Sequence, residues 1–149
     1  MEINGSKKDY CEPMHTAEHL LSGTIARIYG CGRPFSTHIE KRKSKVDFHL
    51  DHQPSREELD RIEFEVNALL QEGLDVTEEF LPRDEAVTRY NLERLPEEAG
   101  ATVRIVRTGD ADACPCVGAH VANTAEIPPI RIVSADCNDG VLRVRFKFQ

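Results

Sequence analysis

The chain has 149 residues, the usual size of one domain, which leaves little room for a second independent core. Its 19 Lys and Arg against 26 Asp and Glu give a net charge of −7. That balance excludes a protein that coats nucleic acids or anionic membranes through its overall charge. From its length we expect a single domain over residues 1–149. No apolar run approaches the roughly 18 residues of a bilayer span, so we expect no membrane partner.

The cysteine content and the N-terminus indicate the compartment. The first ten residues contain no apolar stretch of the kind found in signal peptides. The chain has five cysteines, an odd number, which fits free or metal-bound thiols better than a disulfide framework. We therefore expect a cytoplasmic protein.

The first third of the chain predicts a helix followed by a hairpin. Residues 11–29 carry Leu20, Leu21, Ile25 and Ile28 at near-helical spacing, and glycines follow them. Residues 35–40 and 46–51 read as extended segments, the second with strict apolar and polar alternation. The basic run at residues 41–45 is then expected to form the tip of the hairpin.

The middle of the chain predicts a second helix. Ser55 followed by Glu58 is a capping-box pattern, and Leu59, Ile62 and Val66 begin a buried stripe that ends at Gly73. Residues 74–81 read as extended, residues 83–91 as a short helix, and the sequence around residues 96–100 as a polar loop.

The last third predicts strands at residues 102–107, 130–135 and 141–148. The final two are joined around Asn138, Asp139 and Gly140, an Asp-Gly hairpin signal. Helices interspersed among hairpins, without strict strand-helix alternation, favour an α+β fold: a two-layer domain with a mostly antiparallel sheet packed by helices.

Two pairs of side chains stand at metal-ligand spacing. His15 and His19 are four residues apart on the first expected helix, which places both imidazoles on one face. Glu18 precedes the second histidine, unlike the Glu of the H-E-x-x-H metalloprotease helix, so we expect a solvent-facing residue there and no general base.

The second pair is Cys116 and His120, in a stretch rich in Cys, Pro and Gly where a tight turn could bring thiolate and imidazole together. Three imidazoles and one thiolate suit zinc better than magnesium or calcium. Cys114, two residues before Cys116, is expected to pack in the interior and is an alternative thiol ligand.

The motifs also resemble a known family. Residues 15–21, HTAEHLL, followed far downstream by residues 116–121, CVGAHV, look like the two metal motifs of the alanyl-tRNA synthetase editing domain and its free-standing AlaX relatives. The same fold occurs in the editing domain of threonyl-tRNA synthetase. The resemblance extends through residues 123–127 to the final strands and suggests the short, stand-alone form.

This resemblance implies a zinc-dependent hydrolase that removes a wrong amino acid from tRNA. The implied zinc ligands are His15, His19, Cys116 and His120. A hydroxyl residue on the strand after the first helix helps such proteins recognise misactivated serine, and the matching catalytic-site position is Ser36, with Thr37 beside it. Ala119 departs from the Thr or Pro that usually precedes the final histidine, which leaves the substrate open.

Two mechanisms are compatible with four protein ligands. In the first, one ligand is loose or the zinc becomes five-coordinate, and the zinc lowers the pKa of a bound water molecule. In the second, the zinc anchors the amino or terminal ribose group of the substrate while an ordered water molecule attacks.

Because the chain is acidic overall, a tRNA acceptor end must meet local cations. Two clusters are candidates for phosphate contacts, one in the expected hairpin tip and one alternating along the last strand. Their members are Lys41, Arg42, Lys43, Lys45, Arg143, Arg145 and Lys147.

The leading hypothesis is a deacylase for Ser-tRNA(Ala), and Gly-tRNA(Ala) is a further candidate substrate. One alternative keeps the chemistry on another mischarged tRNA such as Ser-tRNA(Thr). Another is a zinc-stabilised tRNA-binding or protein-binding module without hydrolysis.

Overall fold

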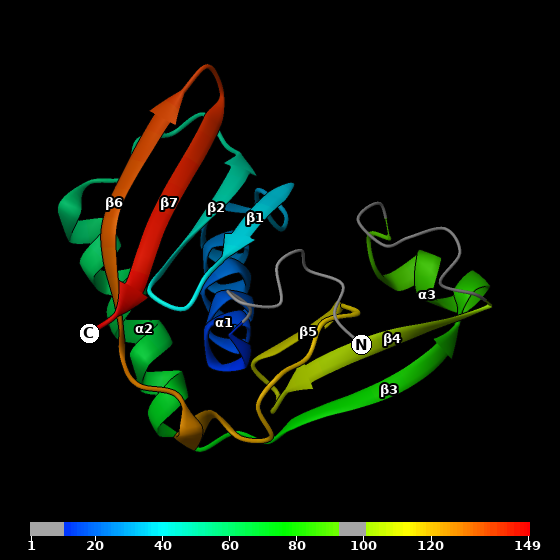
Figure 1. Ribbon diagram of the computed structural model, residues 1–149. Helices are drawn as coiled ribbons and strands as arrows, with labels where there is room; N and C mark the ends of the chain where they lie inside the picture. The colour runs from blue at the N-terminus through cyan, green and yellow to red at the C-terminus, as the bar shows by residue number, and fades with distance from the viewer. Residues whose placement is uncertain (1–10, 93–100) are drawn as a thin grey trace.

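The computed structural model describes residues 11–92 and 101–149. The polar loop expected around residues 96–100 lies outside the described residues. Three α-helices, Glu12–Tyr29 (α1), Arg56–Gln71 (α2) and Arg83–Arg89 (α3), accompany two antiparallel sheets (Figure 1). The expected α+β class with antiparallel pairing is confirmed, and the strands divide between two sheets.

The first sheet has four strands in the order β1-β2-β7-β6. Their bounds are Ser36–Ile39 (β1), Lys43–His49 (β2), Ile130–Asn138 (β6) and Val141–Phe148 (β7). The second sheet has the order β3-β4-β5, with bounds Val76–Pro82, Thr102–Thr108 and Asp112–Pro115. A 3-10 turn, Thr124–Glu126 (η2), connects the second sheet to β6.

Helices α1 and α2 cover one face of the four-stranded sheet. Alternate residues of β2 and β7, such as Val46, Phe48 and Phe146, are fully buried against apolar side chains of the two helices. Burying side chains of this size contributes about 1.5–3 kcal/mol each. On its other side α1 contacts β5, so this helix lies between the two sheets.

Local sequence signals set the ends of both long helices. Gly30 ends α1 in the left-handed region at φ 65°, where glycine has no Cβ penalty. At α2 the predicted capping box is present: Ser55 Oγ accepts the Glu58 N–H, and the Glu58 side chain accepts the Ser55 N–H.

The predicted hairpin tip at residues 41–45 is wrong in its extent. Strand β2 begins at Lys43, so Lys43 and Lys45 lie within the sheet, and of the basic run only Lys41 and Arg42 lie in the turn, after Glu40. Strand β2 pairs with β7 from Lys43↔Lys147 to His49↔Val141. This pairing makes β2 begin three residues before residue 46, where the apolar and polar alternation of its own sequence begins.

Strand β5 and the 3-10 turn were not predicted from the sequence. Residues 112–115 contain no β-branched or aromatic side chain and end in proline, so the strand owes its form to pairing with β4 through Cys114↔Val106 and its neighbours. Within residues 11–92 and 101–149, no helix combines the length and the hydropathy that a membrane span requires.

Candidate metal centre

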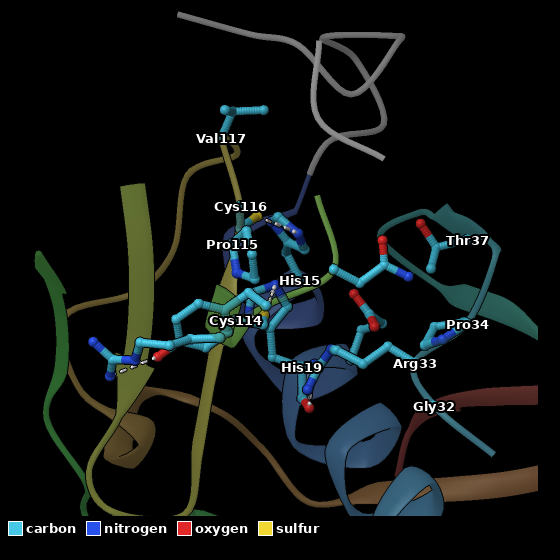
Figure 2. Close-up of a pocket in the computed structure, with 14 residues that line it drawn as sticks. His15, His19, Gly32, Arg33, Pro34, Thr37, Cys114, Pro115, Cys116 and Val117 are labelled. Atoms are coloured by element: carbon cyan, nitrogen blue, oxygen red, sulfur yellow. Dashed lines mark hydrogen bonds between the residues drawn. The ribbon is translucent and has the colours of Figure 1, made fainter. Parts of the chain in front are cut away.

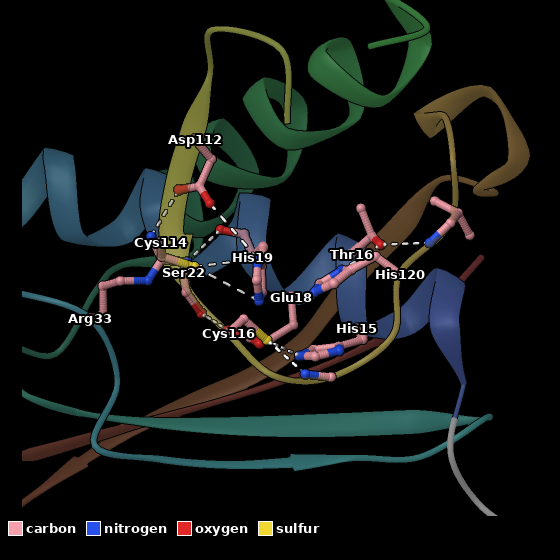
Figure 3. Close-up of polar contacts among 12 residues, drawn as sticks. His15, Thr16, Glu18, His19, Ser22, Arg33, Asp112, Cys114, Cys116 and His120 are labelled. Atoms are coloured by element: carbon pink, nitrogen blue, oxygen red, sulfur yellow. Dashed lines mark hydrogen bonds and ion pairs between the residues drawn. The ribbon is translucent and has the colours of Figure 1, made fainter. Parts of the chain in front are cut away.

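The two histidine and cysteine pairs meet at the junction of α1 and the segment that follows β5. One donor atom from each of His15, His19, Cys116 and His120 can be chosen so that all four lie within 4.8 Å of one another. The ring centroids of the three histidines are separated by 4.2 to 4.9 Å (Figure 3). The structure thus brings together all four residues that the two motifs single out.

Hydrogen bonds orient two of the imidazole rings. His15 Nδ1 lies 3.2 Å from the carbonyl oxygen of Ala119, which can only accept, so Nδ1 carries the proton in this contact. His15 Nε2 is then the unprotonated nitrogen of that ring, the atom that can bind a metal, and it lies 3.5 Å from Cys116 Sγ. Ala119 therefore supports the centre through its backbone, whatever its side chain.

His120 is held in the same way by Thr16. Its Nδ1 lies 2.8 Å from Thr16 Oγ1, which also accepts the Val121 N–H. His120 Nε2 is buried and has no hydrogen-bond partner among the described residues. A buried nitrogen lone pair without a partner is costly, and a metal ion would satisfy it. The residues present therefore fit a metal, and a donor set of three imidazoles and one thiolate fits zinc.

The protonation states of the rings also suit a metal. Burial lowers the pKa of His120 to about 2. Burial, followed by the neighbouring imidazoles, holds the pKa of His19 well below its ordinary value. Both rings are therefore neutral at pH 7, the form that donates to metals. Burial raises the pKa of the Cys116 thiol, so metal binding must displace its proton.

Cys114 and Asp112 lie beside His19, behind the four-donor group. Cys114 is buried, as expected, with Sγ 3.4 Å from His19 Nδ1, and Asp112 Oδ2 lies 4.0 Å from the same nitrogen. These three residues form a second group of potential metal donors that shares His19 with the first. Arg33 binds Asp112 Oδ1 at 2.8 Å and also donates to the His19 carbonyl.

The centre opens into a cavity of about 400 Å³ between α1, the start of β1 and the end of β5 (Figure 2). Thr37 lines this cavity, and Ser36 does not. Ser36 is exposed and pairs with Asp47 on the outer face of the sheet, because neighbouring residues on a strand point to opposite faces. Of the two predicted hydroxyl residues, the structure brings Thr37 alone to the cavity.

Glu18 also lines the cavity and is 5% exposed, so the expectation of a solvent-facing residue is wrong. The sequence contained the missed signal: His15, Glu18, His19 and Ser22 are spaced as one face of a helix. That whole face is buried at the centre.

The predicted cations of β2 and β7 lie on the outer face of the four-stranded sheet, opposite the helices. Strand pairing sets Lys43 beside Lys147 and Lys45 beside Arg145, so two clusters far apart in sequence form one surface. Arg143 and Arg145 are engaged by Asp47 and Asp136. Lys43, Lys45 and Lys147 form no ion pair with another residue of the described ranges.

The comparisons with known proteins agree with this site. Residues 103–145, which include Cys116 and His120, match the family described as the threonyl and alanyl tRNA synthetase second additional domain. The family is a class of domain that is named after the threonyl and alanyl tRNA synthetases.

The similar proteins are alanine–tRNA ligases. That of Hyperthermus butylicus is 37% identical over 87% of this chain, that of Methanothrix thermoacetophila 34% over 89%, and that of Bacillus velezensis 36% over 80%. The chain spans only 14% to 15% of the length of these relatives. The resemblance to the alanyl-tRNA synthetase editing-domain family is confirmed over most of the chain.

Proposed function

We propose that this protein hydrolyses the ester of mischarged tRNA, with Ser-tRNA(Ala) as its leading substrate. The observation that carries the proposal is that Thr37 lines the same cavity of about 400 Å³ as His15, His19 and Cys116, three members of the four-donor group. His15, His19, Cys116 and His120 would hold zinc. When bound, zinc supplies this cavity with a Lewis acid.

The surrounding residues position the reaction. An aminoacyl ester is already activated, so the site must orient the ester and a water molecule more than create an exceptional nucleophile. Thr16 and the Ala119 carbonyl fix the rings of His120 and His15, and Thr37 lines the same cavity as His15. We propose that the Thr37 hydroxyl binds a polar side chain of the amino acid.

The outer face of the four-stranded sheet supports a tRNA partner. Lys43, Lys45 and Lys147 stand side by side on it, and β1 separates this face from the cavity. We propose that the acceptor stem lies against these cations, with Arg143 and Arg145 beside them, while its 3′ end crosses β1 into the cavity.

The direct test is to incubate the zinc-loaded protein with Ser-tRNA(Ala) and Ala-tRNA(Ala). We expect serine to be released well above the protein-free rate and alanine to be spared. Release from Ser-tRNA(Thr) but not from Ser-tRNA(Ala) would favour the alternative substrate that Ala119 leaves open. Binding of both tRNAs with no release from any substrate would favour the module without hydrolysis.

A second prediction separates Thr37 from Ser36. We expect Thr37→Val to slow the release of serine by about 10-fold to 100-fold, because a lost hydrogen bond to a substrate hydroxyl costs about 1.5–3 kcal/mol in a desolvated site. Ser36→Ala, one residue away and outside the cavity, is the matched control and should keep the wild-type rate. If single-turnover deacylation were slowed by Ser36→Ala and not by Thr37→Val, Ser36 would be the hydroxyl residue that recognises the substrate.

A further inference from the structure

Glu18 is a buried carboxylate with no assigned task. It lies between His15 and Ser22 on the polar face of α1, which turns toward the cavity. Among the described residues that line this cavity, it is the one carboxylate. Charged groups are rarely buried without a partner, because the loss of hydration is expensive.

The protein itself satisfies Glu18 only in part. Ser22 Oγ donates a hydrogen bond of 2.5 Å to Oε2, and this is the one side-chain hydrogen bond that Glu18 forms within the described ranges. The ionised carboxylate can accept several more. Figure 3 shows Glu18 and Ser22 beside His19 and Cys116.

The neighbouring cation is already engaged. Arg33 donates to Asp112 Oδ1 at 2.8 Å and to the His19 carbonyl at 3.1 Å. The charge of Asp112, which is 5% exposed, therefore balances that of Arg33. Arg33 acts on Glu18 only through its electrostatic field, because no hydrogen bond or ion pair joins the two within the described residues. Arg89, which also lines the cavity, is paired with Glu85. The acceptor sites of Glu18 that Ser22 leaves open are therefore available to a cationic group that enters the cavity.

We propose that Glu18 binds the α-ammonium group of the amino acid carried by the tRNA. This inference rests on the proposed function and narrows its substrate class. An aminoacyl ester with a free amino group presents one positive charge close to the ester bond, where the cavity has one carboxylate. An ester whose amino group is acylated, as in peptidyl-tRNA, has no such charge and leaves Glu18 without its ligand.

The test compares Ser-tRNA(Ala) with N-acetylseryl-tRNA(Ala). Glu18→Gln keeps the size of the side chain and the bond from Ser22 and removes the charge. We expect this variant to hydrolyse the free-amine ester about 10-fold to 100-fold more slowly than the wild type, and the acetylated ester at the wild-type rate. Glu12→Gln, on the exposed first turn of the same helix, should change neither rate.

Two results in this experiment would overturn the inference. Equal slowing of both esters would mean that Glu18 acts on the ester or on water, and no slowing of either would mean that it does not contact substrate. Zinc content is measured for each variant, so that a lost metal is not mistaken for a lost contact.

If the wild type released no amino acid from any tRNA, the proposed function would be rejected. A measurement of affinity for two unreactive probes would still test the role of Glu18. The probes are 3′-seryl-amino-3′-deoxyadenosine, which carries a stable amide, and its N-acetyl derivative. We expect wild-type protein to bind the free amine about 10-fold to 100-fold more tightly. Equal affinity for the two probes would overturn the inference without any variant having to fold.

Discussion

Replacing Cys116 with alanine is expected to lower the zinc content of the purified protein from about one ion per chain to almost none. A Cys116 thiolate would be the one anionic donor beside three imidazoles, and those of His19 and His120 are neutral. Zinc analysis of the gel-filtered protein measures this directly. Deacylation should fall by more than about 100-fold, because a catalytic metal contributes several kcal/mol to a transition state.

Cys114→Ala is the matched control for this experiment. Cys114 lies two residues away on the same segment, is equally a thiol, and is 4% exposed beside His19. We expect this variant to keep its zinc and its activity and to lose about 1 kcal/mol of folding stability from lost packing. Loss of zinc on Cys114→Ala with zinc retained on Cys116→Ala would instead assign the ion to His19, Asp112 and Cys114.

Metal removal from the wild type gives the same information through stability. A ligand that binds only the folded state at 1,000 times its Kd stabilises by about 4 kcal/mol. A chelator should therefore lower the wild-type melting temperature and leave that of Cys116→Ala unchanged. A chelator effect of equal size in both proteins would contradict a site that depends on Cys116.

The local part of the site was readable from the sequence. The spacing of His15 and His19 places two rings on one helical face whatever the rest of the fold does, and the same applies to the capping box of Ser55 and Glu58. The alternation of Arg143, Arg145 and Lys147 likewise gave their common face. Each of these features depends only on the period of a single element.

Features that depend on pairing between elements were not readable. Thr37 pairs with Val46 on the inner face of the sheet and therefore reaches the cavity, whereas Ser36 pairs with Asp47 on the outer face. The register between β1 and β2 decides which of the two neighbouring residues faces inward. Lys43 and Lys45 join the sheet because β7 extends beside them. Glu18 was misjudged for a different reason, since its spacing to Ser22 already indicated the buried face.

We expect the ion pair of Arg33 and Asp112 to be costly to break, because burial raises the pKa of Asp112 even with Arg33 beside it. Asp112 is 5% exposed and Arg33 about a third exposed, so the two partners are not equivalent. Where α1 crosses this pair the helix has Gly23, and a Cβ at that position would clash with Asp112 Oδ1. The close approach leaves no room for water to replace a lost partner of Asp112.

We expect Arg33→Met to destabilise the protein by about 3 kcal/mol, near the lower end of the range for breaking a buried pair, because the Asp112 carboxylate is then buried without its partner. Asp112→Asn should cost less, about 1–2 kcal/mol, because Arg33 keeps the His19 carbonyl and partial access to solvent. The double variant should be more stable than Arg33→Met alone, since it leaves no unpaired charge. Urea unfolding at pH 7 with zinc in excess, and with zinc content checked, measures all three.

The control for this cycle is an ion pair on the surface. Arg107 binds Glu79 at 2.9 Å, and both side chains are about 40% exposed. Arg107→Met removes the same charge where water can replace the partner, so it should cost no more than about 1 kcal/mol. The losses of stability from Arg33→Met and Asp112→Asn would contradict this prediction if they were additive and no larger than the loss in the control. In that case solvent would have to reach Asp112, and the pair would not anchor β5 to α1 beside the centre.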